Sequence, residues 1–202
     1  MANRLTDNIQ RDFGINLSKK WLAWGAVCPD VLPQYKIVRH YKEYSEDFLV
    51  NEIVSLIYLS RFFDFKNMDR FKKRYISRKI GVISHFLSDY MCLPHKENWT
   101  FDKSFVDHYK YEKDLNKYAK SHEFTENIIG VKPIDLYEDE TIHLKELVIN
   151  YIDQVEKEYS KSVSFKRDLD FALNLSFNMS SFILEVAQAL ATEKDLRYSF
   201  VF

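Results

Sequence analysis

Residues 68–92, MDRFKKRYISRKIGVISHFLSDYMC, decide the fold. Large apolar residues recur in this stretch at every third or fourth position, at Ile76, Ile80, Ile83, Leu87 and Met91. This spacing is that of one face of an α-helix, and Pro94 restricts the backbone so that the helix ends before it. The stretch therefore predicts a long amphipathic helix with one side in a hydrophobic core.

The segments on both sides of this stretch also predict helices. Residues 46–63, EDFLVNEIVSLIYLSRFF, are apolar around most of a helix's circumference, which indicates burial on several sides. Further helices are expected over residues 4–13, 17–27, 103–120, 144–159 and 169–190, with residues 126–139 as a connection. About five to seven helices joined by loops of modest length predict an all-α, single-domain helical bundle over residues 1–202.

The composition agrees with this class and excludes others. Hydrophobic residues make up 46% of the 202-residue chain and the net charge is −1, so the chain can bury a core and disorder is excluded. Only 4 Gly and 4 Pro are present, too few for the turns of an all-β protein. With 29 basic against 30 acidic residues, the chain has no surplus of positive charge for binding a long nucleic acid.

The apolar runs and the cysteines bear on where the protein is located. The first residues, MANRLTDNIQRDFG, contain no apolar signal segment, and no run reaches the ~18 apolar residues of a membrane span. The two cysteines, Cys28 and Cys92, are too few for a disulfide framework. These features predict a cytoplasmic protein without a transmembrane segment, or a secreted one if a leader has been removed.

Histidines and carboxylates gather in the middle of the chain as spaced pairs. His85 and Asp89 are four residues apart on the long predicted helix, so both side chains leave the same face. That face otherwise carries small residues such as Gly81, which we expect to leave room between helices. His108 and Glu112 repeat the spacing on the next helix, there on a largely apolar stripe.

The full pattern, His-x3-Asp-x5-His-x12-His-x3-Glu, runs from His85 through His95 to Glu112. A buried, unpaired carboxylate is costly, and a cation facing it removes that cost. Imidazole and carboxylate are ligands that Zn²⁺ accepts, while the absence of paired cysteines argues against a structural thiolate site. The pattern predicts a zinc site, the alternative being surface pairs or hydrogen-bonded core histidines. His122 and His143 lie in polar surroundings, and we expect them to be solvated.

The segments GVISHFLSDYMCLPHKENWT (81–100) and DHYKYE (107–112) resemble the signature of the zinc-dependent phospholipase C family. In that all-α family, which shares its fold type with the P1 nucleases, a His-x3-Asp helix is followed by a Pro-His loop and a His-x3-Glu helix. The upstream segment GAVCPD (25–30) is similar to the family's Gly…Pro-Asp loop, which a histidine follows. The resemblance therefore adds Asp30 and His40 to the candidate ligands.

Carried over residue by residue, the resemblance implies two zinc ions. The first is held by Asp30, His40, His85 and Asp89, and the second by His95, His108 and Glu112. Asp30 is also implied as the catalytic general base, or as the residue that orients the attacking water, because a loop can bring its carboxylate to that water. The family's third zinc, bound by an N-terminal Trp and an early His, lacks its expected ligands: the chain starts with Met1 and has no histidine before His40.

The resemblance implies a zinc-dependent phosphoric diester hydrolase with phospholipase C-like cleavage. The expected substrate is a small phosphodiester or a phospholipid head group. Val31 follows Asp30 where the family's choline-binding Tyr is expected. The resemblance therefore supports hydrolysis of a phosphoester more strongly than it supports specificity for a choline head group. The alternatives are a nuclease or a small-molecule phosphodiesterase on the same fold, and a metal-binding domain without turnover.

Overall fold

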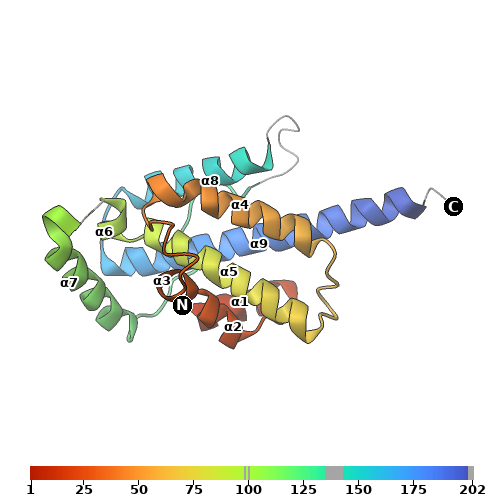
Figure 1. The fold of residues 1–202 in the computed structure, drawn as a ribbon, viewed down its shortest axis with the longest axis horizontal. Helices are drawn as coiled ribbons and strands as arrows, with labels where there is room; N and C mark the ends of the chain where they lie inside the picture. The colour runs from red at the N-terminus through yellow and green to blue at the C-terminus, as the bar shows by residue number, and fades with distance from the viewer. Residues whose placement is uncertain (98, 100, 135–142, 200–202) are drawn as a thin grey trace.

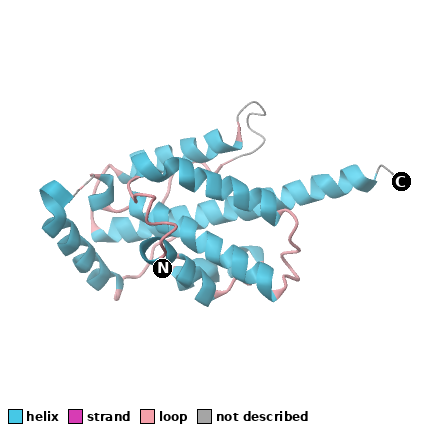
Figure 2. Ribbon diagram, viewed as in Figure 1, coloured by secondary structure: helices cyan, strands magenta, loops and turns pink. Residues whose placement is uncertain are grey.

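The computed structural model describes residues 1–97, 99, 101–134 and 143–199, with the backbone alone at 101–105 and 193–199. Over these residues the chain forms nine α-helices and no strand (Figure 1, Figure 2). The helices are α1 (Ala2–Phe13), α2 (Lys19–Gly25), α3 (Cys28–Val31), α4 (Lys42–Ser60), α5 (Arg70–Tyr90), α6 (Leu93–Lys96), α7 (Phe101–Ala119), α8 (Leu144–Tyr159) and α9 (Phe165–Ser199). The all-α prediction is confirmed, and the short helices α3 and α6 are additions to it.

Helix α5 lies in the middle of the bundle and packs against α2, α4 and α9 (Figure 1). Helix α8 covers α4 and α9 on one side. Helices α6 and α7 lie at one end of the bundle, while the C-terminal part of α9 extends beyond the other helices at the opposite end. This arrangement leaves α7 attached to the bundle through few neighbours.

Helix α5 forms as its sequence predicts. The carboxylate of Asp69 accepts hydrogen bonds from the backbone N–H groups of Phe71 and Lys72 at 2.8 and 2.9 Å, which caps the first turn. The apolar stripe is buried in the core at Ile76, Ile80, Ile83 and Leu87. Each such side chain contributes about 1.5–3 kcal/mol relative to an exposed one, so the stripe holds the helix in place.

Helices α2 and α5 cross in direct backbone contact at two glycines. A Cβ at Gly25 would lie 2.1 Å from the carbonyl oxygen of Arg78, and one at Gly81 would lie 2.2 Å from that of Leu22. Both distances are far inside the ~3.5 Å of normal contact, so only glycine permits this approach. The prediction that small residues such as Gly81 leave room between helices is therefore wrong, because the backbone of α2 fills the space beside Gly81. The crossing brings the end of α2 next to His85.

The side chain of His122 is enclosed, and the prediction that it is solvated is wrong. Its side chain is 3% exposed, and its Nε2 lies 2.7 Å from Oδ1 of Asp170 on α9. The same oxygen accepts a hydrogen bond from the backbone N–H of Thr125 at 3.0 Å. These contacts fasten the segment after α7 to α9. His143 is exposed, as predicted.

Within the described ranges, every helix is too short or too polar to pass through a bilayer. The cytoplasmic location and the extent of the domain, residues 1–202, stay predictions.

Candidate metal centre

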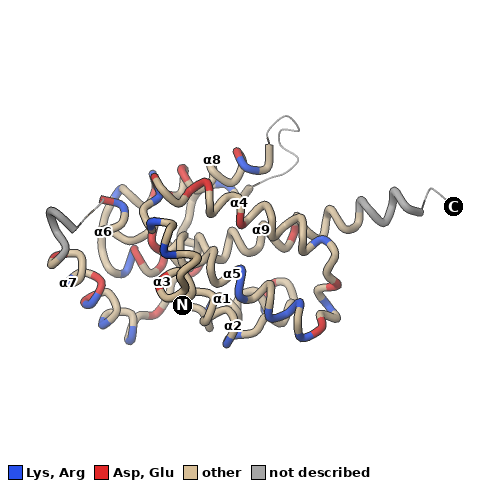
Figure 3. Tube along the Cα trace, in the orientation of Figure 1, with Lys and Arg blue, Asp and Glu red and all other residues tan. Residues whose placement is uncertain are grey.

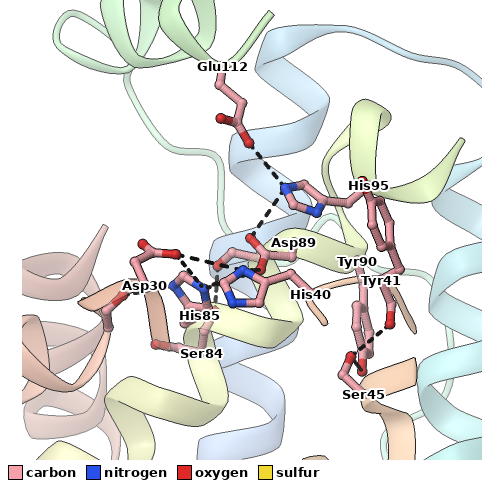
Figure 4. A network of polar contacts seen from close by, with 12 residues as sticks. Asp30, His40, Tyr41, Ser45, Ser84, His85, Asp89, Tyr90, His95 and Glu112 are labelled. Atoms are coloured by element: carbon pink, nitrogen blue, oxygen red, sulfur yellow. Dashed lines mark hydrogen bonds and ion pairs between the residues drawn. The ribbon is translucent and has the colours of Figure 1, made fainter. Parts of the chain in front are cut away.

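The structure brings all seven predicted ligand residues together around one end of α5, and Figure 4 labels six of them, all but His108. They come from five segments: Asp30 from α3, His40 from the chain before α4, His85 and Asp89 from α5, His95 from α6, and His108 and Glu112 from α7. They form a first cluster (Asp30, His40, His85 and Asp89) and a second cluster (His95, His108 and Glu112). Residues that are spread over the sequence from position 30 to position 112 thus lie close together in the folded chain.

The first cluster places the ring nitrogens of two histidines close to the oxygens of two aspartates. Nδ1 of His40 lies 3.1 Å from Oδ2 of Asp89 and 3.7 Å from Oδ1 of Asp30. Nε2 of His85 lies 3.3 and 3.6 Å from the same two oxygens, and 3.2 Å from Nδ1 of His40. Four ligand atoms bound tetrahedrally to zinc at ~2.0–2.1 Å are about 3.3 Å from one another. Asp30, His40 and His85 therefore converge closely enough to hold a zinc ion, with Asp89 beside the two histidines as a further ligand.

The second cluster has three donors. Nε2 of His95 and Nε2 of His108 lie 3.1 and 2.9 Å from Oε1 of Glu112. Oδ1 of Asp89 lies 4.0 Å from Nε2 of His95, so Asp89 presents one oxygen to each cluster (Figure 4). Three protein ligands leave a fourth position of a tetrahedral ion for water or substrate, which is the arrangement of catalytic rather than structural zinc.

Backbone carbonyls orient two of the histidines. Nδ1 of His85 lies 2.9 Å from the carbonyl oxygen of Ala26, and Nδ1 of His108 lies 3.0 Å from that of Trp99. A carbonyl only accepts hydrogen bonds, so each Nδ1 carries a hydrogen; in the neutral form that binds a metal, each ring presents the lone pair of Nε2 to its cluster. Metal-ligating histidines are typically fixed in this way. Sequence reasoning missed Ala26 and Trp99, because every residue has a carbonyl.

The electrostatics of both clusters favour a cation. The carboxylate of Asp89 beside His40 raises the pKa of that imidazole, although burial opposes the charge. Hydrogen bonds from His95 and His108 hold the pKa of Glu112 below its usual value. Among the described residues, Oδ2 of Asp89 is buried and accepts no hydrogen bond of good geometry, although two ring nitrogens lie beside it. A divalent ion satisfies this oxygen and the converging lone pairs together, so the residues fit zinc.

Two expectations about individual carboxylates need correction. Asp30 lies in the short helix α3 rather than in a flexible loop, although its side chain is 58% exposed. Glu112 is not buried on an apolar stripe; its side chain is 47% exposed. The reason is the position of α7 at the end of the bundle, where only part of its surface is covered. Asp89, at 16%, is the enclosed carboxylate.

Comparison with known proteins bears directly on this site. The model of the family described as zinc-dependent phospholipase C matches residues 1–166, a span that contains every residue of both clusters. No curated protein and no solved structure gave a match.

Proposed function

Because the chain belongs to the zinc-dependent phospholipase C family, we propose that it is a zinc-dependent hydrolase of phosphodiesters, with a small phosphodiester or a phospholipid head group as substrate. The observation that carries the proposal is the convergence of donors in the first cluster, where two ring nitrogens lie 3.1–3.7 Å from the oxygens of two aspartates, beside a second cluster of three donors. This combination of a filled and an open ligand set supports chemistry at the second cluster and at the space between the two.

The proposal assigns the metal ligands by cluster. One zinc ion is held by Asp30, His40, His85 and Asp89, and a second by His95, His108 and Glu112. Bound zinc polarises a phosphoryl oxygen and lowers the pKa of a bound water towards ~7. Two zinc ions and three carboxylates leave a net charge of about +1, which complements the single negative charge of a phosphodiester.

Asp30 is the proposed general base. Its Oδ1 faces the first cluster while much of the side chain is open to solvent, so it can accept a proton from a water at the mouth of the site. Asp89 is enclosed between ring nitrogens of both clusters, and we assign it a ligand role only. The two aspartates thus take different parts in the proposed reaction.

The charge distribution favours a small substrate over a long nucleic acid. Basic and acidic residues are interspersed along the described chain (Figure 3). Proteins that track a phosphate backbone usually present a continuous basic surface. A nuclease acting on long polymers is therefore the weaker proposal for this fold.

Zinc content and a substrate panel test the proposal together. Protein purified without chelator is expected to contain about two zinc ions per chain by elemental analysis. The panel comprises nitrophenyl phosphocholine, bis-nitrophenyl phosphate, phosphatidylcholine vesicles and single-stranded DNA. Less than about a tenth of an equivalent of zinc after zinc addition would reject the metal site. Fully loaded protein that cleaves nothing on the panel would favour a metal-binding domain without turnover.

Chelation is expected to lower the melting temperature. The ligands join segments far apart in sequence, and removal of zinc leaves three carboxylates close together. Zinc at about 1,000 times its dissociation constant stabilises by ~4 kcal/mol, equivalent to roughly 8–16 °C for a chain of this size. Thermal unfolding with and without a chelator measures the shift. An unchanged melting temperature, with metal loss shown by elemental analysis, would contradict this linkage.

A further inference from the structure

A buried carboxylate lies behind the second cluster. Asp168, in the first turn of α9, is 2% exposed. The hydroxyl of Tyr111 donates to its Oδ2 at 2.6 Å, and the hydroxyl of Tyr159 donates to its Oδ1 at 2.7 Å. The backbone N–H of Leu93 on α6 lies beside this carboxylate and favours its charged form, which lowers its pKa against the effect of burial. Asp168 thus accepts hydrogen bonds from α7 and α8 and lies beside α6.

Two of these three neighbours lie on the elements that carry the second cluster. Tyr111 directly precedes Glu112 on α7, and Leu93 lies two residues before His95 on α6. Helix α6 has only four residues, and so short a helix has no stability of its own. Helix α7 lies at the end of the bundle with few neighbours (Figure 1). Both elements therefore need an external anchor to hold their ligands at a fixed separation.

His95 depends on such an anchor more than His85 and His108 do. His85 and His108 each have one ring nitrogen held by a backbone carbonyl. Nδ1 of His95 is buried and has no hydrogen-bond partner among the residues that the structure describes, so no such contact within that part of the chain sets the orientation of this ring. The direction of Nε2 towards Glu112 then follows from where the backbone of α6 is held.

We propose that Asp168 is a positioning residue for the second cluster, and this inference rests on the proposed function in taking that cluster as a zinc site. Its carboxylate holds α7 through the hydroxyl of Tyr111 and lies beside the backbone N–H of Leu93 on α6, and so sets the separation of His95 and Glu112. Asp168 lies outside the residues matched by the family model, 1–166, so that match does not include it.

Two tyrosine variants provide a matched test. Tyr111→Phe and Tyr159→Phe each remove one hydroxyl from the same carboxylate, at 2.6 and 2.7 Å, but only Tyr111 lies on a ligand helix. We expect similar drops in melting temperature. Zinc affinity, measured by competition with a chromophoric chelator, is expected to fall about 10–100-fold in Tyr111→Phe and in Asp168→Asn, and less than about threefold in Tyr159→Phe.

A double-mutant cycle assigns the effect to the second cluster. In a Glu112→Gln background, which disables that cluster, Tyr111→Phe is expected to cause no further loss of zinc affinity. The absorption bands of cobalt-loaded protein provide a second readout, since Tyr111→Phe should shift them and Tyr159→Phe should leave them unchanged.

Different experimental results would overturn the positioning role of Asp168 and the proposed hydrolase function. Equal losses of affinity in Tyr111→Phe and Tyr159→Phe, or no loss in folded Tyr111→Phe protein, would overturn the positioning role alone. Wild-type protein that binds no zinc would overturn both proposals. Full zinc without turnover would overturn the hydrolase alone, because the affinity measurements would still decide the role of Asp168.

Discussion

Asp30→Asn is expected to retain most of its zinc and to lose turnover by about 10²–10⁴-fold, the loss typical of removing a general base. The substitution keeps the shape and the oxygen that faces the first cluster, but the amide cannot accept a proton as a carboxylate does. The exposed position of Asp30 at the mouth of the site makes its metal contact the most replaceable of the set. Hydrolysis of nitrophenyl phosphocholine and elemental zinc analysis on the same sample measure both effects.

Asp89→Asn is the matched control for this experiment. The chemical change is identical, but Asp89 is enclosed and its two oxygens face ring nitrogens of both clusters. Loss of its charge should therefore empty at least one metal site. If Asp30→Asn loses zinc as completely as Asp89→Asn, Asp30 is chiefly a ligand and its assignment as the base is wrong.

Gly81→Ala is expected to lower the free energy of unfolding by roughly 3 kcal/mol or more. The new Cβ would lie 2.2 Å from the carbonyl oxygen of Leu22 and 2.8 Å from the backbone nitrogen of Ala26. Backbone atoms of a packed helix cannot rotate away, so α2 would have to move. This steric cost exceeds the ~1 kcal/mol that alanine normally gains over glycine inside a helix. Urea denaturation measures the change.

Gly130→Ala is the control for the glycine substitution. There the nearest atom to a new Cβ is Oε1 of Glu158 at 3.3 Å, the end of a flexible side chain that can shift. We expect a change within about 0.5 kcal/mol. Gly81→Ala should also weaken zinc binding, because displacement of α2 removes the carbonyl of Ala26 from His85. An unchanged urea midpoint for Gly81→Ala would show that the two helices have room to separate.

The helices that could be predicted from sequence are those with a long apolar repeat. Helix α5 follows its isoleucine and leucine stripe, and α8 (Leu144–Tyr159) has the bounds that its periodicity predicts. Helix α9 is longer than predicted, since its period weakens towards both ends. Helices α3 and α6 have four residues each, too few to show any period.

The candidate site could be predicted only as far as its residue types and spacing. The i, i+4 pairs and the family resemblance identified residues that the structure brings together, and their roles as ligands stay a proposal. The hydrogen-bond partners of these residues could not be predicted from the sequence, because packing between distant segments determines them. His122 shows the same limit: its partner, Asp170, is 48 residues away on another helix. Asp168 is likewise separated from Tyr111 by 57 residues.

The carbonyl contacts of His85 and His108 have a consequence for how this site can evolve. The contacting groups belong to the main chain at Ala26 and Trp99, so a change of side chain there leaves the hydrogen-bond acceptor in place. Substitutions at these two positions are therefore compatible with an intact metal site, provided that the backbone conformation is unchanged. Among relatives of this chain, we expect identity at positions 26 and 99 to vary while the histidines they orient do not.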